Sequence, residues 1–154
     1  MIVVADTSGL LAALDESHPE GSAARKVLRE AGTLVVSPVL LSEIDHVARR
    51  VLGRVAAHQA IEDIMRWAKA GRVVLPEVSA AILDTAQAVR VRYLDLRLDL
   101  ADAVNVAFAE EFRTNVVLTL DRHDFRAVRP LTVHRAFRLL PDDSRTVAQR
   151  LTGS

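Results

Sequence analysis

Short apolar runs rich in β-branched residues alternate along the chain with longer segments whose apolar positions recur every three or four residues. The short runs predict strands at Ile2–Ala5, Thr33–Val36, Arg72–Leu75 and Asn115–Leu120, with a weaker fifth near Phe137–Leu140. The periodic segments predict helices at Ser8–Leu14, Glu20–Ala31, Pro38–Leu52, Val55–Ala70, Val78–Tyr93 and Asp99–Phe112. Because strands that alternate with helices favour parallel pairing, we expect an α/β sandwich around a parallel sheet.

The composition fits one globular domain. Half of the 154 residues are apolar and 26% are charged. We expect the domain to span residues 1–140 and the polar tail 141–154 to be mobile. No run approaches the roughly 20 apolar residues of a membrane span. No basic segment followed by an apolar stretch opens the chain, so we expect no signal peptide and a cytoplasmic location.

Cysteine and charge narrow the possible chemistry. The absence of cysteine excludes disulfides, thiolate zinc sites and cysteine nucleophiles, and it fits a reducing compartment. The formal net charge is zero, so the overall charge does not indicate a nucleic-acid binder. Arginines are concentrated between residues 113 and 138. A general bias towards arginine and a phosphate-contacting surface both explain that concentration.

Four carboxylates stand where a folded chain rarely places charge: Asp6, Glu43, Asp102 and Asp121. Asp6 and Asp121 each follow an apolar run predicted to be a strand, whereas Glu43 and Asp102 share helix faces with apolar residues. Unpaired carboxylates are costly to bury unless a divalent cation neutralises them, and oxygen-only ligands suit Mg²⁺ or Mn²⁺. The pattern therefore favours a metal-dependent phosphodiesterase, with a ribonuclease as the leading candidate.

Each carboxylate also has a purely structural explanation. Asp6 precedes a predicted helix and is typical of an N-cap, although the hydroxyls of Thr7 and Ser8 beside it could hold a water or a phosphate oxygen. Glu43 could be neutralised by Arg50, two helical turns further along. These alternatives stay open at the level of the sequence.

The acidic and amide residues in the second half of the chain also have both a structural and a functional explanation. Asp99 is predicted to cap the helix that carries Asp102, with a ligand role as the alternative. Asn105 could orient a water molecule or simply satisfy Asp102. Asp121 and Asp124 follow the clearest strand, where turn chemistry alone explains an Asp. We take Asp124 as the second candidate metal ligand of this segment, after Asp121.

Four ordered segments carry these acids: Val-Val-Ala-Asp6-Thr-Ser, Ser-Pro-Val-Leu-Leu-Ser-Glu43, Leu-Ala-Asp102-Ala-Val-Asn and Leu-Thr-Leu-Asp121-Arg-His-Asp124-Phe125. Together they resemble PIN-domain ribonucleases and, more narrowly, the VapC toxins of bacterial type II toxin–antitoxin (VapBC) pairs. The resemblance covers about residues 1–140 and shows no departure at the four main acidic positions.

The resemblance implies a PIN-like three-layer α/β/α sandwich with a central, mainly parallel sheet of about five strands. It implies Mg²⁺ or Mn²⁺ held by Asp6, Glu43, Asp102 and Asp121, with Asp124 assisting. It also implies a homodimer, inhibition by a VapB-type antitoxin, and a structured RNA substrate, either the sarcin–ricin loop of rRNA or tRNA. Metal-activated water would then leave a 5′-phosphate and a 3′-hydroxyl.

Other classes of α/β protein fit less well. A phosphoacceptor receiver domain needs a lysine after the last core strand, but Lys26 and Lys69 both lie in predicted helices. A phosphatase with an Asp-x-Asp nucleophile lacks its second Asp, because Asp6 is followed by Thr-Ser. No glycine-rich phosphate loop is present. A catalytically silent PIN-fold module that binds RNA or an antitoxin stays open as the alternative function.

Overall fold

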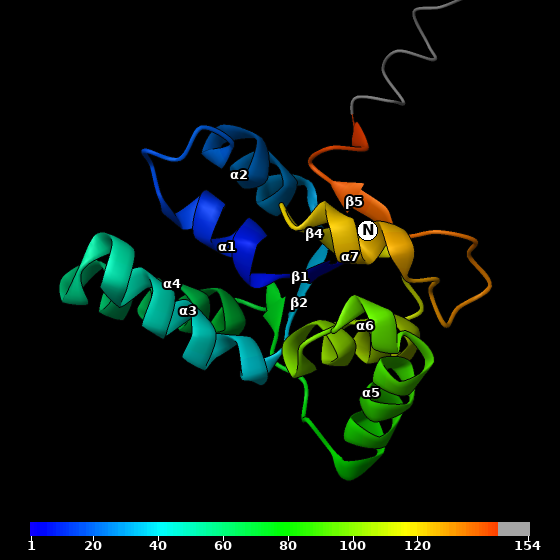
Figure 1. Cartoon of the computed structure of the whole chain (residues 1–154). Coiled ribbons are helices and arrows are strands. Elements are labelled where there is room, and N and C mark those ends of the chain that lie inside the picture. Colours follow the sequence, from blue (N-terminus) through cyan, green and yellow to red (C-terminus); the bar gives the residue numbers. More distant parts are fainter. Residues whose placement is uncertain (145–154) are drawn as a thin grey trace, which may run out of the picture.

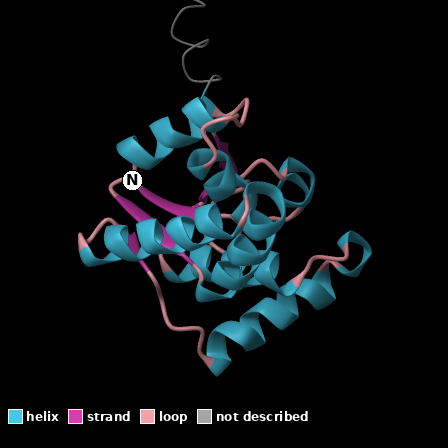
Figure 2. Ribbon diagram, turned by 90° about the vertical axis from the view of Figure 1, so that its left-hand side faces the viewer, coloured by secondary structure: helices cyan, strands magenta, loops and turns pink. Residues whose placement is uncertain are grey.

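The computed structural model describes residues 1–144, which form a five-stranded parallel sheet between two layers of helices (Figures 1 and 2). The strand order is β3-β2-β1-β4-β5, and every neighbouring pair is parallel. The strands are β1 (Ile2–Ala5), β2 (Thr33–Val36), β3 (Val73–Val74), β4 (Val116–Leu118) and β5 (Arg138–Leu140). The predicted parallel α/β sandwich is confirmed.

The long helices also follow the prediction to within a few residues. They are α1 (Thr7–Leu14), α2 (Gly21–Glu30), α3 (Pro38–Leu52), α4 (Arg54–Lys69), α5 (Ala80–Arg92) and α6 (Leu100–Glu111). Two short elements were not predicted: the 3₁₀ helix η1 (Leu94–Leu96) and the helix α7 (Arg122–Ala127). Segments of three and six residues are too short to show a helical period, so the sequence pattern could not detect them.

Alternating side chains of the strands build two cores, one on each face of the sheet. In β1, Val3 and Ala5 pack with the apolar side chains of α1 to α4, whereas Val4 packs with those of α5 and α6 and with Phe125 of α7. Figure 1 shows α5 and α6 on the opposite side of the strands from α1 to α4. Because successive strand residues point to opposite faces, strands buried on both sides read as continuous apolar runs.

Local signals set the ends of α3. Ser37 caps its first turn, where the Val39 N–H donates to the Ser37 hydroxyl at 3.3 Å, and Pro38 occupies the first helical position. Gly53 separates α3 from α4 with a φ of 93°, a left-handed conformation that favours glycine. Among residues 1–144, no helix is long and apolar enough to cross a membrane.

Residues 141–144 pack against the sheet and α7. Pro141 is buried, and Asp143 accepts a hydrogen bond from the Leu139 N–H at 2.7 Å. Both oxygens of Asp143 also accept from the guanidinium of Arg126 on α7, at 2.6 and 2.9 Å. This pair ties α7 to the end of β5. The mobility expected for the rest of the tail concerns residues 145–154, which lie outside the described residues.

Replacing Gly9 by Ala should destabilise the fold, because α1 approaches β4 too closely for a side chain. A Cβ at this position would lie 2.7 Å from both the Cγ and the backbone oxygen of Leu118. We expect a loss of about 1–3 kcal/mol in the free energy of unfolding, measured by urea denaturation. Gly32→Ala is the control. A Cβ at Gly32 would have the backbone N of Met1 as its nearest neighbour, at 3.3 Å, and this end of the chain can shift. Equal losses in the two variants would contradict close packing at Gly9.

Candidate metal centre

The candidate site lies at the carboxyl edge of the sheet, where β1 and β4 end side by side. Val4 pairs with Val117 and Ala5 with Leu118, and the Asp6 N–H then donates to the Leu118 oxygen at 2.9 Å. The residues that follow the two strands are therefore neighbours. This edge is also where ligands bind in open parallel sheets.

Three carboxylates converge most tightly. Asp102, Asp121 and Asp124 each offer one oxygen, and these oxygens all lie within 4.8 Å of one another. Asp102 lies in the first turn of α6 and is buried, whereas Asp121 directly precedes α7 and Asp124 lies in its first turn. The unpredicted helix α7 is what brings Asp124 to the cluster, because its turn folds the chain back beside Asp121.

Asp6 borders this cluster from β1 and is fixed by hydroxyl groups. Its Oδ2 accepts hydrogen bonds from the Thr119 hydroxyl at 2.8 Å and the Ser8 hydroxyl at 3.2 Å. Asp6 occupies the N-cap position of α1, as its sequence context suggests, but its side chain makes no cap hydrogen bond, so capping does not account for the buried carboxylate. Burial raises the pKa of Asp6, and the hydrogen bond from Thr119 partly opposes that shift.

Ser8 and Thr119 also hold the chain that follows β4. The Leu120 N–H donates to the Ser8 hydroxyl at 2.9 Å, and the Asp121 N–H donates to the Thr119 hydroxyl at 3.0 Å. The hydroxyl of Thr119 thus contacts both Asp6 and the backbone of Asp121. It links two candidate ligands that lie more than a hundred residues apart in the sequence. From the sequence, Thr119 is expected only to bond an adjacent carboxylate, and its hydrogen bond to Asp6 confirms that expectation.

Glu43 lies at the rim of the site rather than within the three-carboxylate cluster. It is exposed on α3, although the neighbouring Ile44 is fully buried. The apolar face that carries Glu43 predicts a side chain directed towards the core or a cleft. The structure places it at the boundary between core and solvent, near Asp99 and Asp6. Partial burial raises its pKa, and the charges of Asp99 and Asp6 raise it further. No ion pair between Glu43 and Arg50 occurs within the described part of the chain.

Asp99 is a helix cap, as predicted. Its Oδ1 accepts a hydrogen bond from the Asp102 N–H at 2.8 Å, which fixes the first turn of α6. Two buried polar side chains next to the acids have no partner among residues 1–144: the hydroxyl of Thr7 and the amide of Asn105, which is 1% exposed. Buried polar atoms of this kind are typically satisfied by water or by a bound group.

Burial and neighbouring acids together act on Asp102. Burial, followed by the charges of Asp6, Asp99, Asp121 and Asp124, raises the pKa of Asp102 to about 8. Burial and the charge of Asp124 also raise the pKa of Asp121. Both shifts mean that the site strongly disfavours accumulated negative charge.

The donor set fits a hard divalent cation. All of the candidate ligands are carboxylates, and oxygen-only ligands suit Mg²⁺ or Mn²⁺ rather than softer metals. A cation would offset both the cost of burying the charged acids and their mutual repulsion, which together raise the pKa values. The described residues around the site can therefore hold a divalent metal.

Comparison with known proteins agrees with this geometry. A family model, described as the PIN domain, matches residues 3–130. Ribonuclease VapC26 of Mycobacterium tuberculosis is 36% identical over 130 residues, which are 84% of this chain and 93% of that protein. The chain belongs to the PIN-domain family and, within it, to the VapC-type ribonucleases.

Solved structures show the same fold. VapC20 of Mycobacterium tuberculosis, described as a toxin that cleaves the sarcin–ricin loop, is 18% identical and has a TM-score of 0.70, covering 80% of this chain and 92% of its own. VapBC2 of Rickettsia felis, bound to a promoter DNA fragment, is 14% identical with a TM-score of 0.62. The match covers 86% of this chain and 96% of that chain. A toxin–antitoxin complex of Klebsiella pneumoniae is 19% identical with a TM-score of 0.57. The match covers 85% of this chain and 99% of that chain.

The cap role of Asp99 can be separated from a ligand role by two substitutions. Asp99→Ala should lower the free energy of unfolding by about 1 kcal/mol, because the Asp102 N–H loses its acceptor. Asp99→Ser keeps an acceptor and should preserve both stability and Mn²⁺ affinity, measured by urea denaturation and isothermal titration calorimetry. If Asp99→Ser binds Mn²⁺ as poorly as Asp121→Asn, Asp99 is a ligand and the cap explanation fails.

Without metal, the protein should become less stable as the pH rises. Asp102 binds its proton more tightly in the folded state, with a pKa of about 8 against an ordinary 3.8. Its contribution to stability is therefore greatest below pH 4 and is lost between about pH 4 and pH 8. Between pH 5 and pH 8, we expect the Tm in chelator to fall by about 5 °C or more.

The matched variant is Asp102→Asn, which removes the titrating group. In chelator it should be at least as stable as the unsubstituted chain at pH 8, and much of the pH dependence should disappear. Saturating Mn²⁺ should restore the Tm of the unsubstituted chain at pH 8. A large loss of stability in Asp102→Asn would instead mean that this carboxylate is a structural partner.

Proposed function

We propose that this chain is a metal-dependent endoribonuclease that hydrolyses phosphodiester bonds in structured RNA. The observation that supports this most directly is the convergence of Asp102, Asp121 and Asp124 beside Asp6 at the carboxyl edge of the sheet. In this proposal, these four residues and Glu43 at the rim hold Mg²⁺ or Mn²⁺. Membership of the VapC-type ribonucleases supports the same activity.

Each residue of the site has a proposed role that follows from its position. Asp6, whose Oδ2 is occupied by hydroxyl groups, has its other oxygen left for the cation. The buried amide of Asn105 and the hydroxyl of Thr7 are unpaired groups that can orient a water molecule or a phosphate oxygen. When bound, a divalent cation lowers the pKa of the attacking water and stabilises the charge on the leaving oxygen.

No histidine is needed as a general base in this scheme. His123 lies closest to the acids, with its Nδ1 3.1 Å from Asp124, but its side chain is 85% exposed. An exposed imidazole on the outer side of the cluster is poorly placed to take a proton within it. Attack by water rather than by the ribose 2′-hydroxyl leaves a 5′-phosphate and a 3′-hydroxyl on the products.

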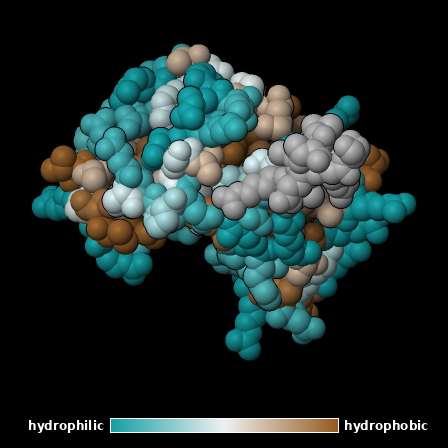
Figure 3. Space-filling view, turned by 90° about the horizontal axis from the view of Figure 1, so that it is seen from above, coloured by the Kyte–Doolittle hydropathy of each residue, from teal (hydrophilic) through white to brown (hydrophobic). Residues whose placement is uncertain are grey.

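The proposed substrate is an RNA loop, either the sarcin–ricin loop of rRNA or a loop of tRNA. The description of VapC20 as a sarcin–ricin loop cleaving toxin supports the first. A VapB-type antitoxin is the proposed inhibitor, which the two similar toxin–antitoxin structures support. We also propose a homodimer. Figure 3 shows apolar surface towards the side on which Figure 1 places α3 and α4, and Val55 of α4 is 85% exposed.

The nuclease proposal predicts metal-dependent scission with defined ends. The purified chain, incubated with total RNA and Mn²⁺, should give fragments that carry 5′-phosphates, detected by ligation-based sequencing of ends with and without phosphatase. Asp6→Asn and Asp121→Asn should each lower the cleavage rate at least about 100-fold, because each removes a charge from the metal site. Chelator should abolish cleavage.

Asp84→Asn is the matched control, because Asp84 is an exposed carboxylate on α5 outside the site. It should cleave at the unsubstituted rate. The catalytically silent alternative makes the opposite prediction: RNA would bind, by gel shift, without any metal-dependent fragment. Scission that persists in chelator, or products with 2′,3′-cyclic phosphates, would also refute the mechanism.

A further inference from the structure

A hollow between α1 and α3 lies next to the acids of the candidate metal site. This α1–α3 groove has a volume of about 240 Å³, and the two helices that form most of it lie side by side (Figure 1). Ser8 lines the groove and also donates to Asp6 at 3.2 Å. Leu120 lines it too and directly precedes Asp121. A strand of RNA whose scissile phosphate lies at the acids therefore has an adjoining nucleotide within reach of the groove.

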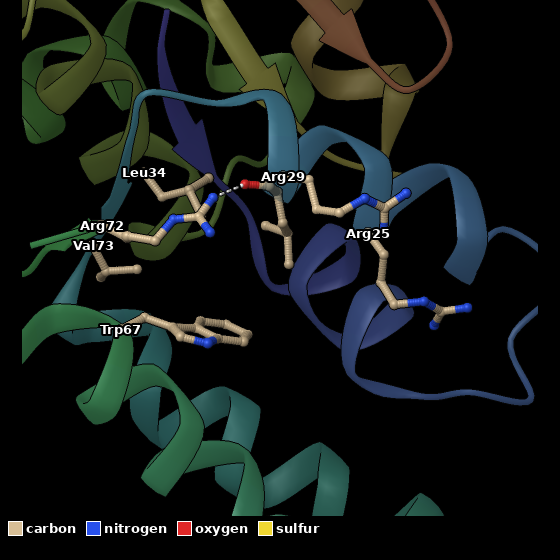
Figure 4. Close-up of a pocket in the computed structure, with 7 residues that line it drawn as sticks. Arg25, Arg29, Leu34, Trp67, Arg72 and Val73 are labelled. Atoms are coloured by element: carbon tan, nitrogen blue, oxygen red, sulfur yellow. Dashed lines mark hydrogen bonds between the residues drawn. The ribbon is translucent and has the colours of Figure 1, made fainter. Parts of the chain in front are cut away.

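The pocket beside β2 and β3 is a separate feature. It has a volume of about 230 Å³, and Figure 4 shows the Trp67 ring on one side of the space with Arg25, Arg29 and Arg72 around the other sides. Within residues 1–144, none of these arginines lies within 4.0 Å of a carboxylate oxygen. The pocket and the groove share no lining residue, so Trp67, the only tryptophan of the chain, reports on the pocket alone.

The walls of the α1–α3 groove are mainly apolar. Leu11 and Ala12 contribute from α1, and Val47, Ala48 and Val51 contribute from α3. Apolar side chains next to a site for phosphodiester hydrolysis suit the flat face of a nucleobase that is turned out of its stack. A volume of about 240 Å³ is below the roughly 300–1,000 Å³ of small-molecule and cofactor sites, so the groove fits one base rather than a whole nucleotide.

Two further polar side chains, Asp15 and His18, line the groove. The Glu20 N–H donates to the His18 Nδ1 at 3.0 Å, so Nδ1 is the acceptor of the ring and Nε2 carries the proton. Asp15 Oδ1 accepts from the N–H and the hydroxyl of Ser17, at 3.0 and 2.6 Å, which leaves Oδ2 without a partner among residues 1–144. The bonds from Ser17 lower the pKa of Asp15, so it is ionised at neutral pH. The groove thus presents one donor and one ionised acceptor.

We infer that the α1–α3 groove binds a purine base of the RNA strand beside the scissile phosphate. The faces of the base lie against Leu11 and Val47, where a purine buries more apolar surface than a pyrimidine does. Its amino group donates to Asp15, and a ring nitrogen or carbonyl oxygen accepts from the Nε2–H of His18. Such recognition rests on the proposed function, because it presupposes an RNA substrate at the acids.

Binding of short RNA in chelator tests this recognition without cleavage. The probes are fluorescein-labelled hexamers of uridine in which the fourth base is adenine, guanine, uracil or absent, and binding is followed by fluorescence anisotropy at low ionic strength. The two purine hexamers should bind at least about threefold more tightly than the uracil and abasic hexamers, because only a purine fills the groove and reaches both polar groups. The emission of Trp67 should stay unchanged.

Two variants of His18 separate contact with the base from support of the loop. His18→Asn keeps an acceptor for the Glu20 N–H but has no donor at the position of Nε2. It should lose the threefold preference for purines while it binds the uracil hexamer as the unsubstituted chain does. His18→Gln places an amide N–H near the position of Nε2 and should keep at least about half of the preference. His58→Asn is the matched control, because His58 is exposed on α4 and does not line the groove.

The apolar wall is tested by Val47→Thr, which places a hydroxyl where the base would lie. This variant should lower the preference for purines about twofold, since burying the hydroxyl against the base is unfavourable. Its oligomeric state is measured by sedimentation. A change from dimer to monomer with the preference intact would make the groove an interface between copies of the chain and would overturn the inference.

Other results would also exclude a purine in the groove. Equal binding of the four hexamers would show that no base is recognised. A preference that survives in His18→Asn, or that falls equally in His58→Asn, would place recognition elsewhere. A change in Trp67 emission with the midpoint of the anisotropy curve would assign the RNA to the pocket beside β2 and β3. The nuclease proposal fails separately: purine preference in chelator without any metal-dependent scission would refute the activity and leave the base site standing.

Discussion

Repulsion among carboxylates gathered at one edge of the sheet is the constraint on which the arrangement of the site depends. The pKa of Asp102, raised to about 8, expresses how unfavourable this concentration of negative charge is in a partly buried place. The rest of the fold must hold the acids together against that repulsion when no cation is bound. Such an arrangement lowers stability at the candidate metal site, as functional sites commonly do.

Three kinds of interaction keep the acids in position. Hydroxyl groups of Ser8 and Thr119 fix one oxygen of Asp6 and the backbone before Asp121. The carboxylate of Asp99 caps the helix that carries Asp102. The Arg126–Asp143 pair ties α7 to the end of β5, and α7 carries Asp124. Hydroxyl hydrogen bonds, a helix cap and an ion pair thus converge on one small region, and each acts on different candidate ligands.

Charge is distributed unevenly although the formal net charge of the chain is zero. Carboxylates gather beyond the carboxyl ends of β1 and β4, and arginines without carboxylate partners border the pocket beside β2 and β3. A zero total therefore conceals two local fields of opposite sign, each suited to a different class of ligand. The acidic field suits a divalent cation, whereas the basic one suits an anion.

The sequence by itself determined the succession of strands and helices along the chain, the parallel pairing of the strands and the list of candidate acids. These follow from apolar periodicity and from charge in apolar surroundings. Tertiary structure alone decided which acids meet. It placed Asp124 in the cluster through a helix too short to show a period, and it left Glu43 at the rim. It also paired Thr119 with Asp6 and gathered arginines from α2 and from the residue before β3 around Trp67. Periodicity along the chain reports which face a residue occupies, but distances between remote segments depend on strand order and helix packing, which no local pattern contains.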